Sequence, residues 1–412
     1  MLGPMKDRYD VAVVGAGAAG LAAAISAARR GASVVVLERL PRPGKKLLAT
    51  GGGRCNLLNE SLSAAAFTSA DPALVAAVFD RYGLKEIKAF FESLGLRLTA
   101  DETGRVYPVT NQAASVLKVL ELEAHRLGVR IETGFEVVGI GTGAAGFEIA
   151  AAESRGVAAR SVVLAGGGRS YPALGSNGSC YALAASFGHR IVTPVPSAVP
   201  LLVRDPMCHF LQGQKMKVRI ESRLGGRPVQ AAEGELLFAQ YGLSGSAVLD
   251  VSESLSVALN REGREDASVV VDFAPFMSEA EMAGEFLRRL EAGWAAKDLG
   301  SGFLPEKLGL FLAQLLAEAG CAEGRGNRPE AARRLAATLK AREFRVHGTR
   351  GWNEAEFTSG GVDSREVEPA TLGSKLCRGV YFAGEVLDVQ AGRGGYNLAW
   401  AWASGAVAGL AA

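Results

Sequence analysis

Three glycines followed by a carboxylate form the strongest chemical signal in the sequence. Gly15, Gly17 and Gly20 lie in the segment VVGAGAAGL, and Glu38 ends the next hydrophobic run, SVVVLE. In such a turn the first glycine allows a sharp bend, the second admits a pyrophosphate close to the backbone, and the third lets helix and strand pack closely. A carboxylate at the end of the next strand accepts hydrogen bonds from ribose hydroxyls and repels a 2′-phosphate. The spacing therefore predicts an adenine dinucleotide, with FAD or NAD favoured over NADP.

This turn must lie between a buried strand and a helix. Residues 11–14 have the pattern of a buried parallel strand, and residues 21–30 that of a helix packed on it. Because residues 11–28 carry no charge, the same segment also fits a membrane span or a signal peptide. The glycine spacing and the RRG that follows favour a buried strand–helix unit, so we expect no association with membranes.

A second glycine-rich segment has the composition of an anion-binding loop. Residues 41–59, PRPGKKLLATGGGRCNLLN, contain three consecutive glycines and four basic residues, Arg42, Lys45, Lys46 and Arg54. Consecutive glycines let backbone N–H groups approach a ligand closely. We expect this loop to lie beside the dinucleotide; a flexible surface loop is the alternative. The glycines at 166–168 end another strand, SVVLAGGG, and are expected at the same ligand-binding edge.

The segment GGYN at 394–397 opens a final apolar helix. The partial positive charge at a helix N-terminus stabilises an anionic group that faces it, which suits a reduced flavin. Tyr396 and Trp400 are four residues apart, so both could equally be ordinary core aromatics on one helix face.

Composition and cysteine usage limit the class of protein. The 412 residues suggest two or three domains, and 48% hydrophobic residues, 21% charged residues and a net charge of +2 are typical of a soluble globular protein without a global attraction to nucleic acid. The five cysteines form no CxxC pair, which fits the reducing cytoplasm and argues against a dithiol reductase. His, Cys, Asp and Glu show no metal-binding spacing. The oligomeric state is not indicated.

The order of helical and strand-like segments predicts a nucleotide domain split by an insertion. We expect a discontinuous dinucleotide-binding domain at 1–194 and 358–412, and a β-barrel-like domain at 195–277 and 343–357. Residues 278–342 switch to helical spacing and are expected to form a helical subdomain.

Two long motifs, KKLLATGGGRCNLLN and VYFAGEVLDVQAGRGGYNLAWAWASG, resemble the BaiN/YhiN-type flavoproteins, a bacterial family of FAD- or NAD(P)-dependent oxidoreductases that includes aminoacetone-oxidase-like members. GELLFAQYGLSG and EAEFTSGGV extend the resemblance over nearly the whole chain. It implies an α/β fold in which a Rossmann-like FAD-binding domain is interrupted by a β-barrel-like domain with a helical subdomain. It also implies tightly but non-covalently bound FAD. The cofactor-binding residues that it implies are Gly15, Ala16, Gly17, Ala19, Gly20, Glu38, Arg39, Lys46, Gly51, Gly52, Gly53, Arg54, Cys55, Asn56, Val137, Ala165, Gly166, Gly167, Gly384, Glu385, Gly394, Gly395, Tyr396 and Asn397.

The active site is expected where the insertion faces the flavin, between GGGRCN, Tyr171 and the loop that begins at Arg393. Arg54 and Arg393 are the candidate cations for an anionic or carbonyl-bearing substrate, and Asn56 and Tyr396 can hydrogen-bond to substrate or flavin. The alternative is that both arginines only bind FAD phosphate or a surface carboxylate.

Cys55 is the only cysteine in a ligand loop. Without a resolving partner we expect it to be a packed wall of the site and not a redox thiol.

The leading hypothesis is an FAD-dependent oxidoreductase that transfers hydride between NAD(P)H, or another donor, and a small or exposed unsaturated or amine substrate. No second nucleotide fold is visible, so NAD(P)H is expected to dock transiently. The alternatives are reduction of uracil in ribosomal RNA, an amine oxidase that uses O2, and a non-catalytic FAD-binding sensor. RNA binding would use residues 325–345, which carry seven Lys or Arg against two Glu; a solvated helix face is the competing interpretation.

Overall fold

The computed structural model describes residues 8–143, 146–152, 155–318 and 326–412. The chain divides into two compact units, the first formed by residues 1–194 and 357–412 and the second by residues 195–356. The finer division of the second unit into a β-barrel-like domain and a helical subdomain stays a prediction. None of the described helices is long and apolar enough to cross a bilayer.

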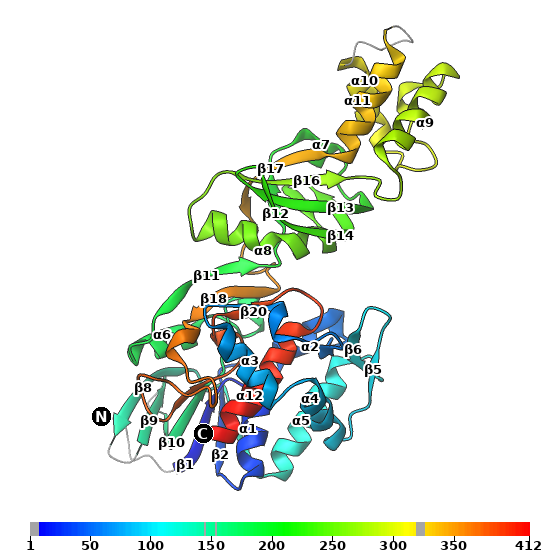
Figure 1. Ribbon diagram of the computed structural model, residues 1–412. Coiled ribbons are helices and arrows are strands. Elements are labelled where there is room, and N and C mark those ends of the chain that lie inside the picture. Colours follow the sequence, from blue (N-terminus) through cyan, green and yellow to red (C-terminus); the bar gives the residue numbers. More distant parts are fainter. Residues whose placement is uncertain (1–7, 144–145, 153–154, 319–325) are drawn as a thin grey trace. The chain divides into compact units, whose positions relative to one another are not determined.

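A seven-stranded sheet forms the centre of the first unit (Figure 1). Its strand order is β7–β2–β1–β10–β9–β8, and β19 also pairs with β10. The bounds are β1 (Arg8–Val14), β2 (Val34–Glu38), β7 (Arg130–Thr133), β8 (Val137–Gly143), β9 (Gly146–Ala151), β10 (Gly156–Leu164) and β19 (Val380–Phe382). Strands β7, β2, β1, β10 and β19 are parallel, whereas β8 and β9 pair antiparallel. The carboxyl ends of the parallel strands therefore meet at one edge, as the predicted Rossmann-like fold requires.

The remaining elements of the first unit surround this sheet. The helices are α1 (Ala18–Arg29), α2 (Lys45–Ala49), α3 (Pro72–Arg81), α4 (Leu84–Ser93), α5 (Ala113–Arg126), α6 (Ser179–Ser186) and α12 (Tyr396–Ala411). Small sheets are formed by β3 (Leu58–Asn59), β6 (Arg105–Pro108) and β5 (Leu98–Ala100), and by β20 (Val389–Ala391) with β4 (Phe67–Ser69). Strands β5 and β6 lie between α4 and α5 and carry no readable sequence signal, because three or four residues are too few to show a period of two.

Two details of the expected nucleotide region differ in the structure. The helix after the glycine turn begins at Ala18, three residues before the expected start, and a short helix, α2, lies inside the expected loop at 41–59. The segment GTGAAG at 141–146 has the same glycine spacing as the first turn. Gly141 and Gly143 lie at the end of β8 and Gly146 begins β9, and these strands pair antiparallel, so the three glycines do not mark a second dinucleotide turn.

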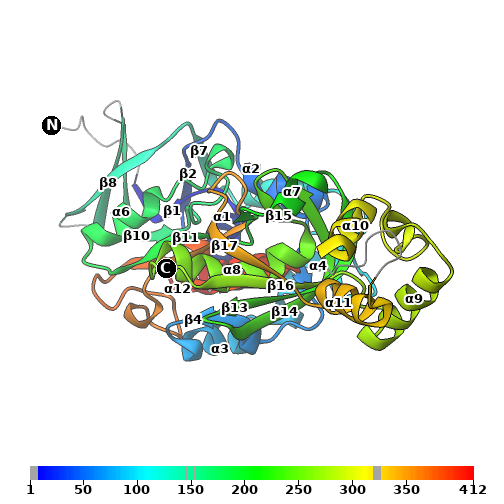
Figure 2. The ribbon, with the colours of Figure 1, turned by 90° about the horizontal axis from the view of Figure 1, so that it is seen from above.

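The second unit contains a closed barrel of six strands in the order β12–β15–β14–β13–β16–β17 (Figures 1 and 2). Their bounds are β12 (Leu201–Val203), β13 (Lys215–Leu224), β14 (Arg227–Ala239), β15 (Gly242–Ser244), β16 (Ala267–Asp272) and β17 (Arg342–Thr349). The helices are α7 (Pro206–Phe210), α8 (Ser246–Asn260), α9 (Glu279–Glu291), α10 (Leu308–Glu318) and α11 (Arg328–Lys340). The predicted barrel-like insertion is thus confirmed, although α8, which packs on β13 and β14, was not expected. Strands β11 (Ile191–Ser197) and β18 (Phe357–Val362) pair where the chain leaves the first unit and returns to it.

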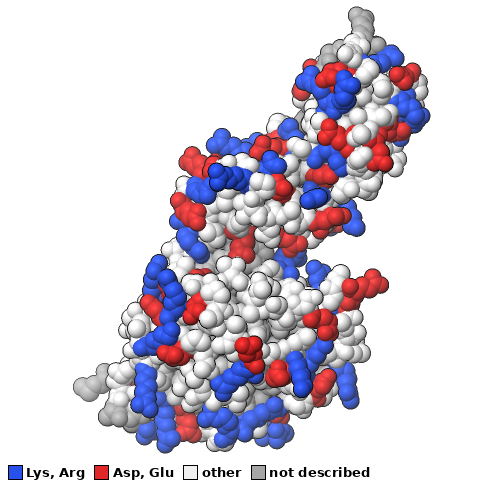
Figure 3. Space-filling view, in the orientation of Figure 1, with Lys and Arg blue, Asp and Glu red and all other residues white. Residues whose placement is uncertain are grey.

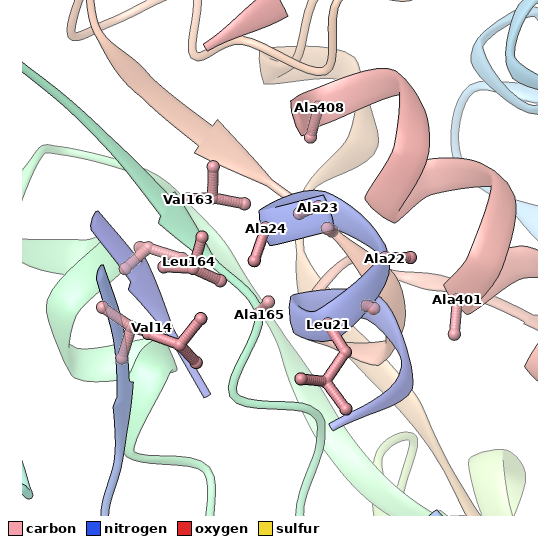
Figure 4. Close-up of a cluster of buried hydrophobic side chains, with 14 of the residues drawn as sticks. Val14, Leu21, Ala22, Ala23, Ala24, Val163, Leu164, Ala165, Ala401 and Ala408 are labelled. Carbon is pink, nitrogen blue, oxygen red and sulfur yellow. The ribbon is translucent and has the colours of Figure 1, made fainter. Parts of the chain in front are cut away.

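Helix α1 is rich in alanine because it lies in contact with both the sheet and α12. Figure 4 shows it between strand side chains such as Val14 and Leu164 and the small side chains of α12. A Cβ added at Gly405 would overlap the carbonyl oxygen of Ala19, and one added at Gly409 would overlap that of Ala23. Both pairs are four residues apart, so the two helices run parallel with their backbones in direct contact.

We expect Gly409→Ala to destabilise the protein by about 1 to 3 kcal/mol, the usual cost of overpacking. Gly284→Ala in α9 is the control, because no described atom lies within 4 Å of a Cβ added there. Alanine should stabilise that helix by about 0.5 to 1 kcal/mol through its higher helix propensity. Urea unfolding followed by circular dichroism measures both changes. Equal effects of the two substitutions would contradict the close helix contact.

Candidate cofactor and active site

In the glycine turn after β1, the first and third glycines are tightly packed and the second borders open space. A Cβ added at Gly15 would lie 2.7 Å from the carbonyl oxygen of Ala165, and one at Gly20 would overlap the carbonyl oxygen of Gly15. At Gly17, by contrast, no described atom lies within 4 Å of an added Cβ. The first and third glycines are therefore required by packing, and the second borders open space at the start of α1. This is the arrangement that a pyrophosphate needs.

Glu38 lies at the same edge with its carboxylate fixed by the backbone. The N–H of Ala16 donates to Oε2 at 2.8 Å, and the N–H of Leu40 donates to Oε1 at 2.9 Å. Each carboxylate oxygen keeps a further lone pair for a ribose hydroxyl. The residues present thus fit the adenosine end of FAD.

This edge is also shaped by Arg39, Val137 and the glycines after β10. Arg39 donates to the carbonyl oxygens of Pro172 and Gly175, both at 3.1 Å, and so holds the loop after β10. Val137 is buried at the start of β8. Gly166 lies against Cys180, where an added Cβ would overlap the sulfur.

Tyr171 and Gly167 lie in the same loop in left-handed backbone conformation. Their φ values are +53° and +75°. For a tyrosine this conformation is strained, and such strain often marks functional sites. A role of Tyr171 in the active site stays a prediction.

The second glycine segment also has the geometry of a ligand loop. Gly51, Gly52 and Gly53 have φ values of +58°, +66° and +88°, and no described atom would contact a Cβ added at Gly52 or Gly53. Arg54 is turned back onto this loop: its Nε donates to the carbonyl oxygen of Gly51 at 3.1 Å, and its guanidinium lies 5.0 Å from the ring centroid of Tyr107. Its expected role as a substrate cation stays a prediction.

The structure brings this loop together with the start of α12. Asn59 donates to the carbonyl oxygen of Gly394 at 3.0 Å. A Cβ added at Gly395 would lie 2.6 Å from the carbonyl oxygen of Leu58 and 2.8 Å from Oδ1 of Asn56. That Oδ1 is buried and has no hydrogen-bond partner among the described residues. Two segments more than 330 residues apart in sequence thus form one wall, and Asn56 keeps an acceptor available there.

Asn397 and Tyr396 have different surroundings at this helix start. Asn397 accepts a hydrogen bond from the N–H of Ala391 at 2.9 Å and donates to its carbonyl oxygen at 2.7 Å, so it holds the preceding loop in place. The ring of Tyr396 packs edge-on against Phe67, with centroids 6.2 Å apart. Arg393 is half-buried in the same loop.

A charged network that the sequence did not reveal anchors Glu385. Lys46 Nζ lies 2.8 Å from Oε2 of Glu385 and 2.7 Å from Oγ of Ser170. Oε1 of Glu385 accepts from the N–H of Thr358 at 2.7 Å and from the Ser170 hydroxyl at 3.2 Å. Three of the roughly four acceptor positions of this carboxylate are therefore occupied by protein. The lysine retains one N–H for a ligand.

Gly384 connects this network to α12. The indole N–H of Trp400 donates to the carbonyl oxygen of Gly384 at 3.2 Å, and the backbone N–H of Gly384 donates to the Ser404 hydroxyl at 2.9 Å. A Cβ added at Gly384 would lie 2.7 Å from the Cβ of Ala19. Trp400 is therefore a core aromatic. Ser170, Thr358, Asn59 and Ser404 were missed because single polar residues carry no pattern until the fold brings them together.

Comparison with known proteins identifies the family. The family described as HI0933-like protein Rossmann domain matches residues 9–411. The chain belongs to this family. It is 38% identical, over 98% of both chains, to the 3-dehydro-bile acid delta(4,6)-reductase of Clostridium scindens. It is 29% identical to the ribosomal RNA dihydrouridine synthase of Escherichia coli, over 97% of this chain and 96% of that one.

Solved structures support the fold of this HI0933-like protein. A 3-ketosteroid-delta4-(5alpha)-dehydrogenase from Rhodococcus jostii RHA1 matches with a TM-score of 0.55, over 100% of this chain and 98% of that one, at 18% sequence identity. At that identity the match shows the fold alone. It confirms the predicted fold, and the family with its 38% identical relative confirms the predicted FAD-dependent oxidoreductase.

Lys46→Met should weaken FAD binding about tenfold or more, because it removes a charged donor and leaves Glu385 unpaired. Lys45→Met is the matched control: it makes the same change of charge one residue away, at a side chain that donates to the carbonyl oxygen of Ala173 at 3.0 Å. Titration of apoprotein with FAD, followed by flavin fluorescence, gives both dissociation constants. If the two variants bind FAD equally well, Lys46 is not part of the cofactor site.

Cys55 should not react as a thiol in the native protein. It is fully buried, and burial raises its pKa to about 12, so almost no thiolate is present at pH 8. Alkylation with iodoacetamide at pH 8 and peptide mass spectrometry should find Cys377, which is only partly buried, modified well before Cys55. Preferential labelling of Cys55 would restore a redox role for it.

Proposed function

We propose that this FAD-dependent oxidoreductase reduces a carbon–carbon double bond conjugated with a carbonyl group in a small, largely apolar substrate. The observation that carries the proposal is the 38% identity, over 98% of both chains, with an enzyme named as a delta(4,6)-reductase. In the net reaction, hydride is added to the β carbon and a proton to the α carbon, which gives the saturated carbonyl compound. We propose NAD(P)H as the hydride donor, oxidised to NAD(P)+ while docked transiently.

The residues of the site suit this chemistry because they can bind and orient the cofactor and the substrate without reacting themselves. When bound, FAD supplies the hydride chemistry, and the protein supplies orientation and electrostatics. Gly17 and Glu38 border the space for phosphates and ribose, and the N-terminus of α12 provides partial positive charge. Asn56 and Tyr396 are the proposed hydrogen-bonding groups for the substrate carbonyl or the flavin. The buried Cys55 thiol supports a mechanism without a protein disulfide.

Reduction of uracil in ribosomal RNA is the second candidate, favoured by the E. coli relative, which is 29% identical over 97% of this chain. The basic segment at 325–345 gives it little support. Arg333 pairs with Glu330 at 2.7 Å, Lys340 with Asp272 at 2.7 Å, and Arg342 with Asp205 at 2.7 Å.

Figure 3 shows acidic and basic side chains interspersed on the visible face of the α9–α11 region. Arg325 lies outside the described residues. A phosphate-tracking surface would need basic side chains without acidic partners, so these pairs favour the solvated helix face.

An amine oxidase that uses O2 and a non-catalytic FAD-binding sensor are the remaining alternatives. Neither is favoured by a feature of the described residues. We propose tight, non-covalent FAD and a cytoplasmic location, in keeping with the scattered cysteines.

Anaerobic stopped-flow absorbance of the bound flavin tests the proposal. We expect slow flavin reduction by NADH or NADPH alone, and reoxidation of the reduced enzyme by a steroid 4,6-dien-3-one at least about tenfold faster than by the saturated 3-ketone. The saturated ketone is the matched control, because it has the same ring skeleton and carbonyl group but lacks the conjugated double bonds. Ribosomal RNA under the same anaerobic conditions, and an amine in a separate aerated assay, are the competing arms. Reoxidation by RNA but not by the dienone, or flavin reduction by the amine with formation of peroxide, would overturn the proposal.

A further inference from the structure

The second unit contains a cavity that the proposed function does not use. Its volume is about 610 Å3, which is within the usual range for small-molecule sites. Residues of β12, α7, β17 and the turn between β14 and β15 line it. All of these elements belong to the barrel unit.

A β-bulge shapes one side of this cavity. Strands β12 and β17 pair antiparallel with Leu202 opposite Gly348 and Val203 opposite Val346, so His347 is the extra residue. A bulge redirects the side chain of the extra residue, and bulges are frequent beside binding sites. His347 accordingly lines the cavity instead of continuing the ladder.

Another side of the cavity comes from the segment GELLFAQYGLSG at 234–245. Its Gln240 and Tyr241 line the cavity. The carbonyl oxygen of Tyr241 accepts from the N–H of Val203 at 3.0 Å. Gly242 has φ +142°, and a Cβ there would lie 2.5 Å from the backbone nitrogen of Val203. Glycine at this position thus lets the motif close onto β12 and places the tyrosine at the cavity.

Arg204 is the one permanently charged cation among the described residues that line the cavity. Arg204, His209 and His347 line it, and Arg204 forms no ion pair with any residue that the structure describes. The one acidic lining residue, Asp205, is already engaged: Oδ1 accepts from the N–H of Met207 at 2.9 Å, and Oδ2 lies 2.7 Å from Arg342. Burial and the nearby Arg204 guanidinium lower the pKa of His347, so this imidazole is mostly neutral at pH 7 and can donate its ring N–H to an anion held by Arg204.

Aromatic and aliphatic groups provide the rest of the lining. The Phe210 side chain is 66% exposed, although it is large and apolar. The Arg350 guanidinium lies 4.7 Å from the ring centroid of Tyr241 and is itself neutralised by Glu354 at 2.5 Å. An exposed phenylalanine beside a tyrosine suits a flat or polycyclic apolar group.

We propose that this cavity binds an apolar ring compound through a carboxylate, with Arg204 as the principal anion contact and Tyr241 and Phe210 against the rings. A carboxylate is favoured over a nucleic-acid backbone, because the single arginine among the described lining residues matches a single anionic group on an apolar body. The inference goes beyond the proposed function, which assigns no ligand to this cavity. It rests on that function only for the choice of a polycyclic probe.

Binding of pyrene-1-carboxylate to the FAD-loaded full chain tests the proposal. Its uncharged analogue of nearly the same shape, pyrene-1-carboxamide, isolates the contribution of the charge. The double bonds of both compounds are aromatic and resist hydride addition, so flavin chemistry does not interfere. Equilibrium dialysis should show the carboxylate bound at least about tenfold more tightly than the amide, the scale of a charged hydrogen bond.

Arg204→Gln should remove that preference, whereas Arg219→Gln, the same change on β13 outside the cavity lining, should keep it. His347→Gln provides a second variant if Arg204→Gln fails to fold, and it should reduce the preference. Equal binding of carboxylate and amide, or equal effects of the two arginine substitutions, would overturn the proposal, as would inorganic phosphate displacing the carboxylate at equal concentration. If charge-dependent binding is found but dienones do not reoxidise the flavin, the proposed function is wrong and the site stands. If dienones reoxidise the flavin but the carboxylate and the amide bind equally well, the proposed function stands and the proposed site is wrong.

Discussion

The direct backbone contact between α1 and α12 determines the geometry of the cofactor edge. Because Gly405 and Gly409 have no side chains, the helices approach closely enough for Ala19 and Ala23 to touch the backbone of α12. Both N-termini then point in the same direction. Measured along the common helix direction, α12 begins about 12 Å before α1, since it starts eight residues earlier relative to the contact and each residue rises about 1.5 Å. An extended ligand with anionic groups at two places can therefore meet positive partial charge at both. The contact also positions Gly384, through Trp400 and Ser404, beside α1.

The local part of this arrangement was predictable from the sequence, and the non-local part was not. The segment from Gly15 to Glu38 contains its own strand, turn, helix and acid, so its pattern was sufficient to predict the fold and the edge that binds the dinucleotide. Helix α8 also had a readable signal, since Ala247, Val248, Val251 and Leu255 are spaced as on one helix face, but the strand-like neighbours hid it.

The anchoring of Glu385 had no sequence signal at all. Its carboxylate was expected to hold the flavin, yet most of its acceptor positions are taken by Lys46, Ser170 and the N–H of Thr358. Likewise, nothing in the sequence indicated that Arg54 would turn back onto Gly51 and Tyr107. Such partners depend on how distant segments pack, and a pattern read along the chain cannot contain that information.

The division between the two units separates general from specific chemistry. The first unit offers glycines, backbone N–H groups and an anchored lysine, which would suit any reaction of the same cofactor. The barrel unit offers a cavity whose shape depends on one bulge and one turn and whose charge depends on a few side chains. Relatives with differently named substrates can share the former and differ in the latter. A change of ligand at the proposed barrel cavity would require few substitutions, all away from the nucleotide turn.

The network around Glu385 also sets an order for assembly of the protein. Lys46 and Glu385 are separated by 339 positions in sequence, and Ser170 and Thr358 come from between them. During synthesis Lys46 emerges 339 residues before its partner Glu385, and α12, which covers α1, follows Glu385 in the sequence. Until then the alanine-rich helix α1 and this part of the cofactor edge lack their packing partners. A nascent chain stalled before Glu385 would therefore hold FAD less tightly than the folded protein does.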